Sequence, residues 1–187
     1  MDFYLILKFL HVASTVVWIG AGVGLVILGI AANSRKDNAG FVRIMQDVVF
    51  LAPRVFVPAS LATLVFGVAA AWTSFGFEML WIDLGIIGYA ATFVTGNYFL
   101  RPRADRITKL VAEGGASDHA VAAGRELLGL AKFDYALLFI VVADMVFKPT
   151  LDQWGVLVVL AIVLAGAAVL FLVPVIRGHH LVGVASA

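Results

Sequence analysis

Residues 3–31 read FYLILKFLHVASTVVWIGAGVGLVILGIA, an apolar stretch in which Lys8 is the only lysine, arginine, aspartate or glutamate. A helix that crosses a bilayer needs about 20 consecutive, mostly apolar residues. Only helices and closed barrels satisfy every backbone polar group in hydrocarbon, and a continuous apolar run selects the helix. The stretch lacks a basic start and is longer than the about 7 to 15 apolar residues of a signal peptide, so we expect it to remain in the mature protein.

The composition of the whole chain is that of a membrane protein. Of its 187 residues, 63% are hydrophobic and 13% are charged, whereas soluble domains are roughly half apolar and about a quarter charged. The net charge of +1 gives no basic excess that would favour nucleic acid. The absence of cysteine excludes disulfides, thiolate metal sites, iron–sulfur clusters and covalent c-type haem attachment. We therefore predict an all-α, polytopic transmembrane bundle in the lipid bilayer, a single domain over residues 1–187.

Five apolar runs predict five spans, near residues 3–31, 50–72, 80–100, 133–147 and 154–176. The fourth is the shortest, and Ser117 is placed to cap a helix that continues into it without a break. The fifth is almost wholly aliphatic, which predicts a peripheral helix beside a four-helix core.

Two longer segments, 33–49 and 101–132, separate the spans and are predicted to be basic cytoplasmic loops. Pro102 is expected to end the third helix, because proline disfavours helical geometry in the residue before it. An amphipathic helix at the membrane surface is the alternative for the first segment, with Phe41, Ile44, Val48 and Val49 on its apolar side.

The distribution of basic residues predicts the orientation. Of the 13 lysines and arginines, all except Lys8 and Lys148 lie in or beside the two long segments and the C-terminal tail. The positive-inside rule then places the N-terminus outside and the C-terminus in the cytoplasm.

Polar side chains recur along one face of the first span. Lys8, His11, Thr15, Trp18 and Gly22 follow one another at spacings of three and four, which places them on a single helical face. In lipid such a face must turn toward the interior of the bundle. At about 1.5 Å per residue, His11 lies roughly 12 Å below the first apolar residues, in the outer half of the bilayer.

Two acids are expected at the same depth. Asp83 lies near the start of the third span and Asp144 near the end of the fourth. We expect both carboxylates to converge with the polar end of the first span, and ionisable groups inside a span mark functional sites by default. Two alternatives remain open: the carboxylates pair with Lys8 as a structural clasp, and His11 serves only as an interhelical hydrogen-bond partner.

The second span carries small residues on one face, among them Thr63 and Gly67. Such faces either let helices approach closely or leave a slot for a flat ligand. Taken with the polar face of the first span, they give the candidate cofactor-binding residues His11, Lys8, Thr15, Trp18, Thr63 and Gly67.

Two segments resemble the HemJ and CopD-like membrane proteins. The first reads KFLHVASTVVW from Lys8 to Trp18, with tryptophan seven residues after histidine, and the second reads PASLATLVFG from Pro58 to Gly67. Trp81 falls where the third helix of those proteins begins with tryptophan. This resemblance covers about the first hundred residues. The whole-chain pattern looks closer still to a bacterial family of predicted integral membrane proteins of unknown function, which implies the bacterial cytoplasmic (inner) membrane.

The resemblance to HemJ-like proteins implies a b-type haem between the helices, with His11 as an axial ligand of the iron. Those proteins oxidise protoporphyrinogen, but they carry a lysine where this chain has Gly85, which leaves the oxidase activity open. A second intramembrane histidine is missing, which leaves three alternatives for the iron. It is five-coordinate, it takes Lys8 or Met145 as its second axial ligand, or it is shared between the His11 residues of a symmetric dimer. We therefore predict a haem-binding redox protein, an electron carrier or a porphyrinogen-oxidase-like enzyme, that forms a homo-oligomer.

Two functions from other classes remain open. One is a small oligomeric transporter or channel component for a metal cation or protons, with His11, Asp83 and Asp144 along the path. The other is an accessory membrane subunit without a cofactor, in which His11 only holds helices together.

Overall fold

The computed structural model describes residues 2–184, with side chains described up to residue 176, and this part of the chain is helical with short connections. In chain order the elements are α1 Phe3–Ser34, α2 Asn38–Leu51, η1 Ala52–Phe56, α3 Val57–Ser74, α4 Leu80–Val94, η2 Thr95–Leu100, α5 Arg101–Gly114, α6 Asp118–Phe147 and α7 Trp154–Val184. The elements η1 and η2 are π-helical turns that join α2 to α3 and α4 to α5. The chain therefore folds into five long rods.

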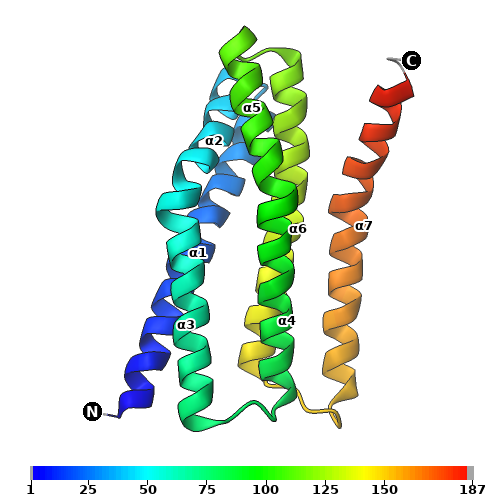
Figure 1. The fold of residues 1–187 in the computed structure, drawn as a ribbon. Coiled ribbons are helices and arrows are strands. Elements are labelled where there is room, and N and C mark those ends of the chain that lie inside the picture. The colour runs from blue at the N-terminus through cyan, green and yellow to red at the C-terminus, as the bar shows by residue number, and fades with distance from the viewer. Residues whose placement is uncertain (1, 185–187) are drawn as a thin grey trace.

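Four of these rods form the core, and α7 packs against α6 at its side (Figure 1). Among the described helices, Phe3–Ser34, Asn38–Ser74 and Trp154–Ile176 are long and apolar enough to cross a membrane. The other two core rods do not meet this criterion of length and composition. One contains α4, which is a short helix, and the other is α6, which carries charged residues along its length. The predicted all-α transmembrane bundle, with a four-helix core and a peripheral C-terminal helix, is confirmed.

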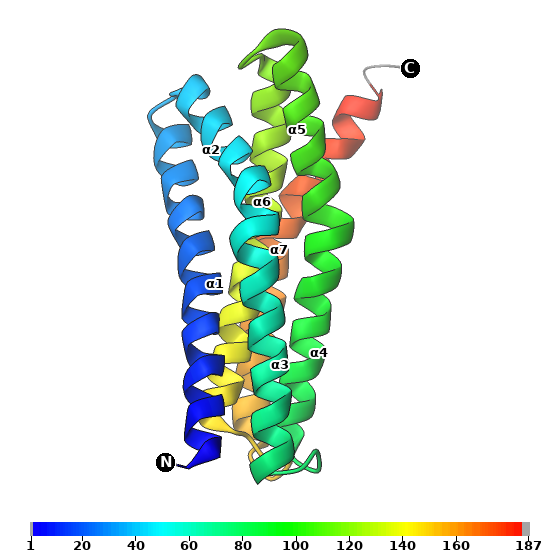
Figure 2. The ribbon, with the colours of Figure 1, turned by 60° about the vertical axis from the view of Figure 1, so that its left-hand side comes forward.

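The predicted helix end at Pro102 is wrong, because the rod continues from α4 through η2 into α5 (Figure 2). In η2 the N–H of Arg101 donates to the carbonyl of Gly96, five residues back. The wider π turn lets Pro102 follow within the first turn of α5, where its missing N–H breaks no bond of a regular α-helix. Pro53 and Pro58 are accommodated in the same way, inside η1 and at the start of α3.

The segments 33–49 and 101–132, predicted as loops with a helix from Ser117 onward, are helical apart from turns at 35–37 and 115–117. Asp37 caps α2 by accepting a hydrogen bond from the N–H of Gly40 at 2.9 Å. Ser117 caps α6 as predicted, with its hydroxyl 3.4 Å from the N–H of Ala120. Gly115 ends α5 with a positive φ of 64°, a conformation that glycine adopts without a steric penalty.

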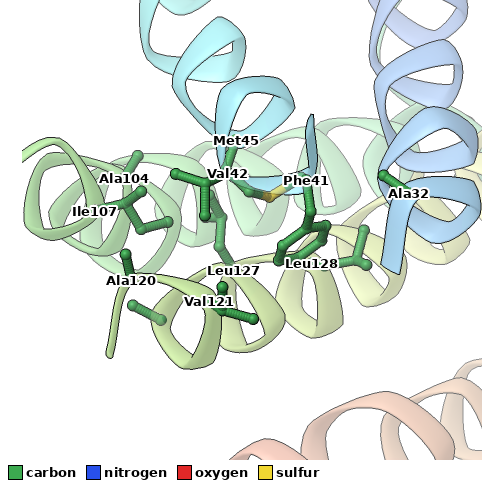
Figure 3. Close-up of a cluster of buried hydrophobic side chains, with 11 residues drawn as sticks. Ala32, Phe41, Val42, Met45, Ala104, Ile107, Ala120, Val121, Leu127 and Leu128 are labelled. Carbon is green, nitrogen blue, oxygen red and sulfur yellow. The ribbon is translucent and has the colours of Figure 1, made fainter. Parts of the chain in front are cut away.

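These helices form a cap at one end of the bundle, made of α2, α5 and the first half of α6. Figure 3 shows its interior, where side chains from the three helices meet, together with Ala32 of α1. Phe41 and Ile107 are almost completely buried there. The amphipathic helix considered for the first segment does form as α2, but its most buried side chains pack inside the bundle against α1, α5 and α6. Those buried residues are Phe41, Val42 and Met45.

Candidate functional site

A largely apolar cavity of about 790 Å³ lies in the half of the bundle opposite the cap. In this half α1 packs along α3 and α4 packs along α6, and the cavity is lined by side chains of all four helices. Its volume falls within the range of about 300 to 1,000 Å³ that is typical of cofactor and small-molecule sites. All six cofactor-binding candidates named from the sequence line it: Lys8, His11, Thr15, Trp18, Thr63 and Gly67.

His11 is held against α3 by a hydrogen bond. Its Nδ1 lies 2.8 Å from the backbone carbonyl oxygen of Thr63. Because a carbonyl only accepts, Nδ1 carries a proton and donates it, which in a neutral ring leaves the lone pair on Nε2. Among the described residues, Nε2 has no hydrogen-bond partner. The hydrogen bond therefore orients the ring, and the neutral form of the ring would offer Nε2 as a ligand to a metal.

The absence of a side chain at Gly67 makes this position of the ring possible. A methyl group at residue 67 would lie 2.7 Å from Nδ1 and 2.8 Å from Cε1 of His11, closer than these atoms can pack. The contact also requires α1 and α3 to stay in register. A hydroxyl network provides this, with Thr63 Oγ1 3.1 Å from Ser14 Oγ and Thr15 Oγ1 3.4 Å from Thr63 Oγ1.

The facing wall of the cavity, formed by α4 and α6, carries a thioether. Met145 lies over Gly85, and a methyl group at residue 85 would collide with its Cε. Gly88 is covered in the same way by Val141. The side chain of Met145 therefore occupies the space beside Gly85. His11 and Met145 line the same cavity from different helix pairs.

Aromatic rings line both ends of the cavity. At the end that we call the mouth, Lys148 Nζ lies 4.9 Å from the ring centre of Trp81 and 5.0 Å from that of Phe75. At the opposite end, the floor, Trp18 meets Tyr89 edge-on with 5.9 Å between ring centres. The hydroxyl of Tyr89 is buried without a hydrogen-bond partner in the described structure. The cavity thus has a basic end beside Lys148 and another end beside Trp18 and Tyr89.

The two acids expected at this site do not line the cavity. Asp83 is exposed. Asp144 is 3% exposed and neither of its carboxylate oxygens has a hydrogen-bond partner among the described residues. Neither acid forms an ion pair with Lys8, and the one ion pair found in the described part joins Arg103 Nε to Glu126 Oε2 at 4.0 Å. The described residues also contain no group of three or more histidines and acids that could hold a metal ion.

Sequence reasoning missed Asp134 and Tyr89. Asp134 is 7% exposed, and its Oδ1 has no partner among the described residues. It lies in the fourth predicted span, so the rule that singled out Asp144 applied to it equally. Nothing in the sequence singles out Tyr89, because aromatic residues are common in apolar spans. Its place at the cavity follows only from the contact with Trp18 in the structure.

A family model described as "Predicted integral membrane protein (DUF2269)" matches residues 5–149. The match spans nearly the whole four-helix core and stops before α7 begins at Trp154. It therefore coincides with the part of the chain that builds the cavity. No curated protein and no solved structure matches this chain.

Proposed function

Because the chain belongs to the DUF2269 family of predicted integral membrane proteins, whose description names no activity, we propose a function from the cavity: a b-type haem-binding redox protein with His11 as axial ligand. One observation carries the proposal. Nδ1 of His11 donates to the carbonyl of Thr63 and leaves Nε2 free at the cavity. Metal-binding histidines characteristically donate their other ring N–H to a carbonyl or carboxylate, which fixes the tautomer and the ring orientation.

The residues present fit a haem better than a free metal ion. A porphyrin supplies four of the ligands of its iron, so the protein needs to provide only one or two more. A cavity with a single histidine and no cluster of acids suits that requirement. Its walls are mostly aliphatic and aromatic, as a macrocycle needs, and Gly67 and Gly85 leave room for the side chains of His11 and Met145.

His11 would hold the iron from the α1–α3 side, and Met145 is the second candidate ligand, from the α4–α6 side. When bound, haem supplies a one-electron carrier. The chain's own residues orient the His11 ring, exclude water with apolar walls, and close the floor with Trp18 and Tyr89. The proposal includes the bacterial cytoplasmic membrane, with the N-terminus and the mouth of the cavity outside.

Transport of a metal cation or protons is the weaker alternative. It requires a polar path, whereas Asp83 is exposed and Asp144 lies outside the cavity lining. We therefore retain only the haem proposal.

The test is the haem content of the protein purified in neutral detergent from haem-replete cells. We expect Soret and α bands in the reduced-minus-oxidised spectrum, and about one haem per chain in a pyridine haemochrome assay. Half that ratio would indicate a haem shared by a dimer. A colourless protein that also takes up no added haem would exclude the proposal.

Replacing Met145 with leucine is expected to lower the reduction potential of the haem by about 0.1 V. Axial ligands shift haem potentials over a range of roughly 0.8 V, so this is a modest change. A methionine ligand stabilises reduced iron, and leucine has a similar volume but no sulfur. Potentiometric titration measures the change. Met45→Leu, buried in the cap, is the matched control. An unchanged potential in Met145→Leu would show that the thioether does not ligate.

Replacing Gly67 with alanine is expected to reduce haem content about tenfold or more. The added methyl group displaces the His11 ring from its place beside the Thr63 carbonyl. Gly24→Ala is the control, because the same change in α1 meets no atom within 4 Å. Equal haem content in the two variants would mean that the position of the ring is irrelevant to haem retention.

A further inference from the structure

Two lysines from distant parts of the sequence stand at the mouth of the cavity. Lys8 comes from α1 and Lys148 follows the last residue of α6, and both line the cavity. Lys148 Nζ lies above the rings of Phe75 and Trp81, and Lys8 Nζ lies 6.0 Å from the ring centre of Tyr4. All three rings also line the cavity. Both positive charges therefore line the cavity next to aromatic neighbours.

The backbone fixes the place of Lys148. It adopts a left-handed conformation with φ of 48°, and its N–H donates to the carbonyl of Asp144 at 2.8 Å. Glycine is the usual residue at such a helix end, and a lysine there accepts a steric cost that glycine avoids. Pro149, almost completely buried, follows directly. The backbone at Lys148 is thus fixed by this turn, and its side chain lies beside the rings of Phe75 and Trp81.

Neither lysine has an acidic partner in the described part of the chain. The acids nearest to them in sequence are Asp2, Asp144 and Asp152, and none of these, nor Glu78 or Asp83, forms an ion pair with a lysine. Glu78 and Asp83 are exposed, and Asp144 is buried outside the cavity lining. An apolar cavity with two unpaired cations at one end matches an amphiphile with an apolar body and acidic groups at one edge.

We propose that Lys8 and Lys148 bind the two propionate carboxylates of the porphyrin, so that its acidic edge lies at the mouth and its apolar edge at the Trp18–Tyr89 floor. This inference rests on the proposed function and adds the direction in which the macrocycle enters. Charge-assisted hydrogen bonds to carboxylates, formed at the edge of an apolar cavity, are stronger than the same contacts in water.

The experiment compares three probes with the apoprotein in neutral detergent: haem b, haem b dimethyl ester, and iron-free protoporphyrin. Absorbance and fluorescence titrations give the dissociation constants. We expect the native protein to bind the dimethyl ester about tenfold more weakly than haem b, because esterification removes both negative charges. The double variant Lys8→Met with Lys148→Met should bind haem b as weakly as the native protein binds the ester. Its affinity for the ester should equal that of the native protein. Lys109→Met is the control, because Lys109 is exposed on α5, and this variant should still bind haem b more tightly than the ester.

Two outcomes overturn the inference and leave haem binding intact: equal affinity of the native protein for haem b and its ester, or an undiminished preference in the double variant. If the double variant binds the ester as the native protein does, the variant is folded. The comparison of haem b with its ester on the native protein tests the inference without any substitution. His11→Ala separates the two proposals, since it should weaken the binding of haem b but not the binding of iron-free protoporphyrin. If His11→Ala affects neither probe while the lysine effect persists, the ligand is a porphyrin and the haem proposal fails alone. Binding of no probe overturns both.

Discussion

Replacing His11 with alanine is expected to lower the haem content of the purified protein from about one per chain to below about a tenth of that value. The change removes the one histidine that lines the cavity, and the iron then lacks a nitrogen ligand from the protein. The folded state loses one hydrogen bond, from Nδ1 to the Thr63 carbonyl at 2.8 Å, which costs only about 1 kcal/mol. The protein should therefore still insert and purify. Pyridine haemochrome assays on equal amounts of protein measure the effect.

His119→Ala is the matched control for this prediction, because His119 is exposed on α6 within the cap. Free imidazole provides the complementary measurement, since it enters the space left by the missing ring and should restore part of the haem to His11→Ala. A merely structural histidine would show no such rescue. If His11→Ala retains full haem content, His11 is not the ligand and the proposal loses the observation on which it depends.

The position of this site follows from helical periodicity and burial. The polar side chains of the first span recur every three to four residues, so they share one face, and hydrocarbon forces that face inward. This argument places Lys8, His11 and Trp18 in the interior without any knowledge of the other helices, and all three line the cavity. It also explains why Thr63 and Gly67 join them, because only small residues let α3 approach a face that carries an imidazole.

The pairing of side chains across helices could not be predicted in the same way. Depth along a helix follows from residue number, but rotation about the helix axis depends on packing. Asp144 and Met145 are adjacent in sequence and lie at nearly the same depth, yet Met145 lines the cavity and Asp144 is buried outside its lining. The contact between Met145 and Gly85 depends on the register of α4 against α6, which neither segment encodes alone.

Within the cap, α5 was assigned to a loop because it has few apolar residues. In α5 the buried side chains are Ala104 and Ile107, spaced three apart on a helix that is otherwise mostly polar or charged. A search for membrane spans passes over such a pattern, which is typical of an amphipathic helix in a soluble bundle. The prolines reinforced the error, since π turns at η1 and η2 carry the rods past them.

Replacing Phe41 with alanine is expected to destabilise the cap by about 3 to 5 kcal/mol, the usual cost of removing a fully buried phenylalanine. Phe41 is 1% exposed and lies at the centre of the cluster formed by α2, α5 and α6 (Figure 3). Its ring packs on Gly124, where a methyl group would lie 2.7 Å from Cε1, so the helices have little freedom to close the space. In a chain of this size the loss corresponds to a fall of about 6 to 20 °C in the midpoint of thermal unfolding.

Phe50→Ala makes the same chemical change at the end of α2, where the residue is 57% exposed and the guanidinium of Arg54 lies 4.0 Å from the ring centre. This control should cost under about 1 kcal/mol. Amide hydrogen exchange locates the effect: in Phe41→Ala, exchange in α2 and α5 should rise about a hundredfold or more, while α4 stays protected. Equal exchange in the two variants would mean that the buried cluster does not hold the cap together. Because the cavity lies in the other half of the bundle, haem content should be unchanged in both variants, and its loss in Phe41→Ala would show that the cap and the cavity unfold as one unit.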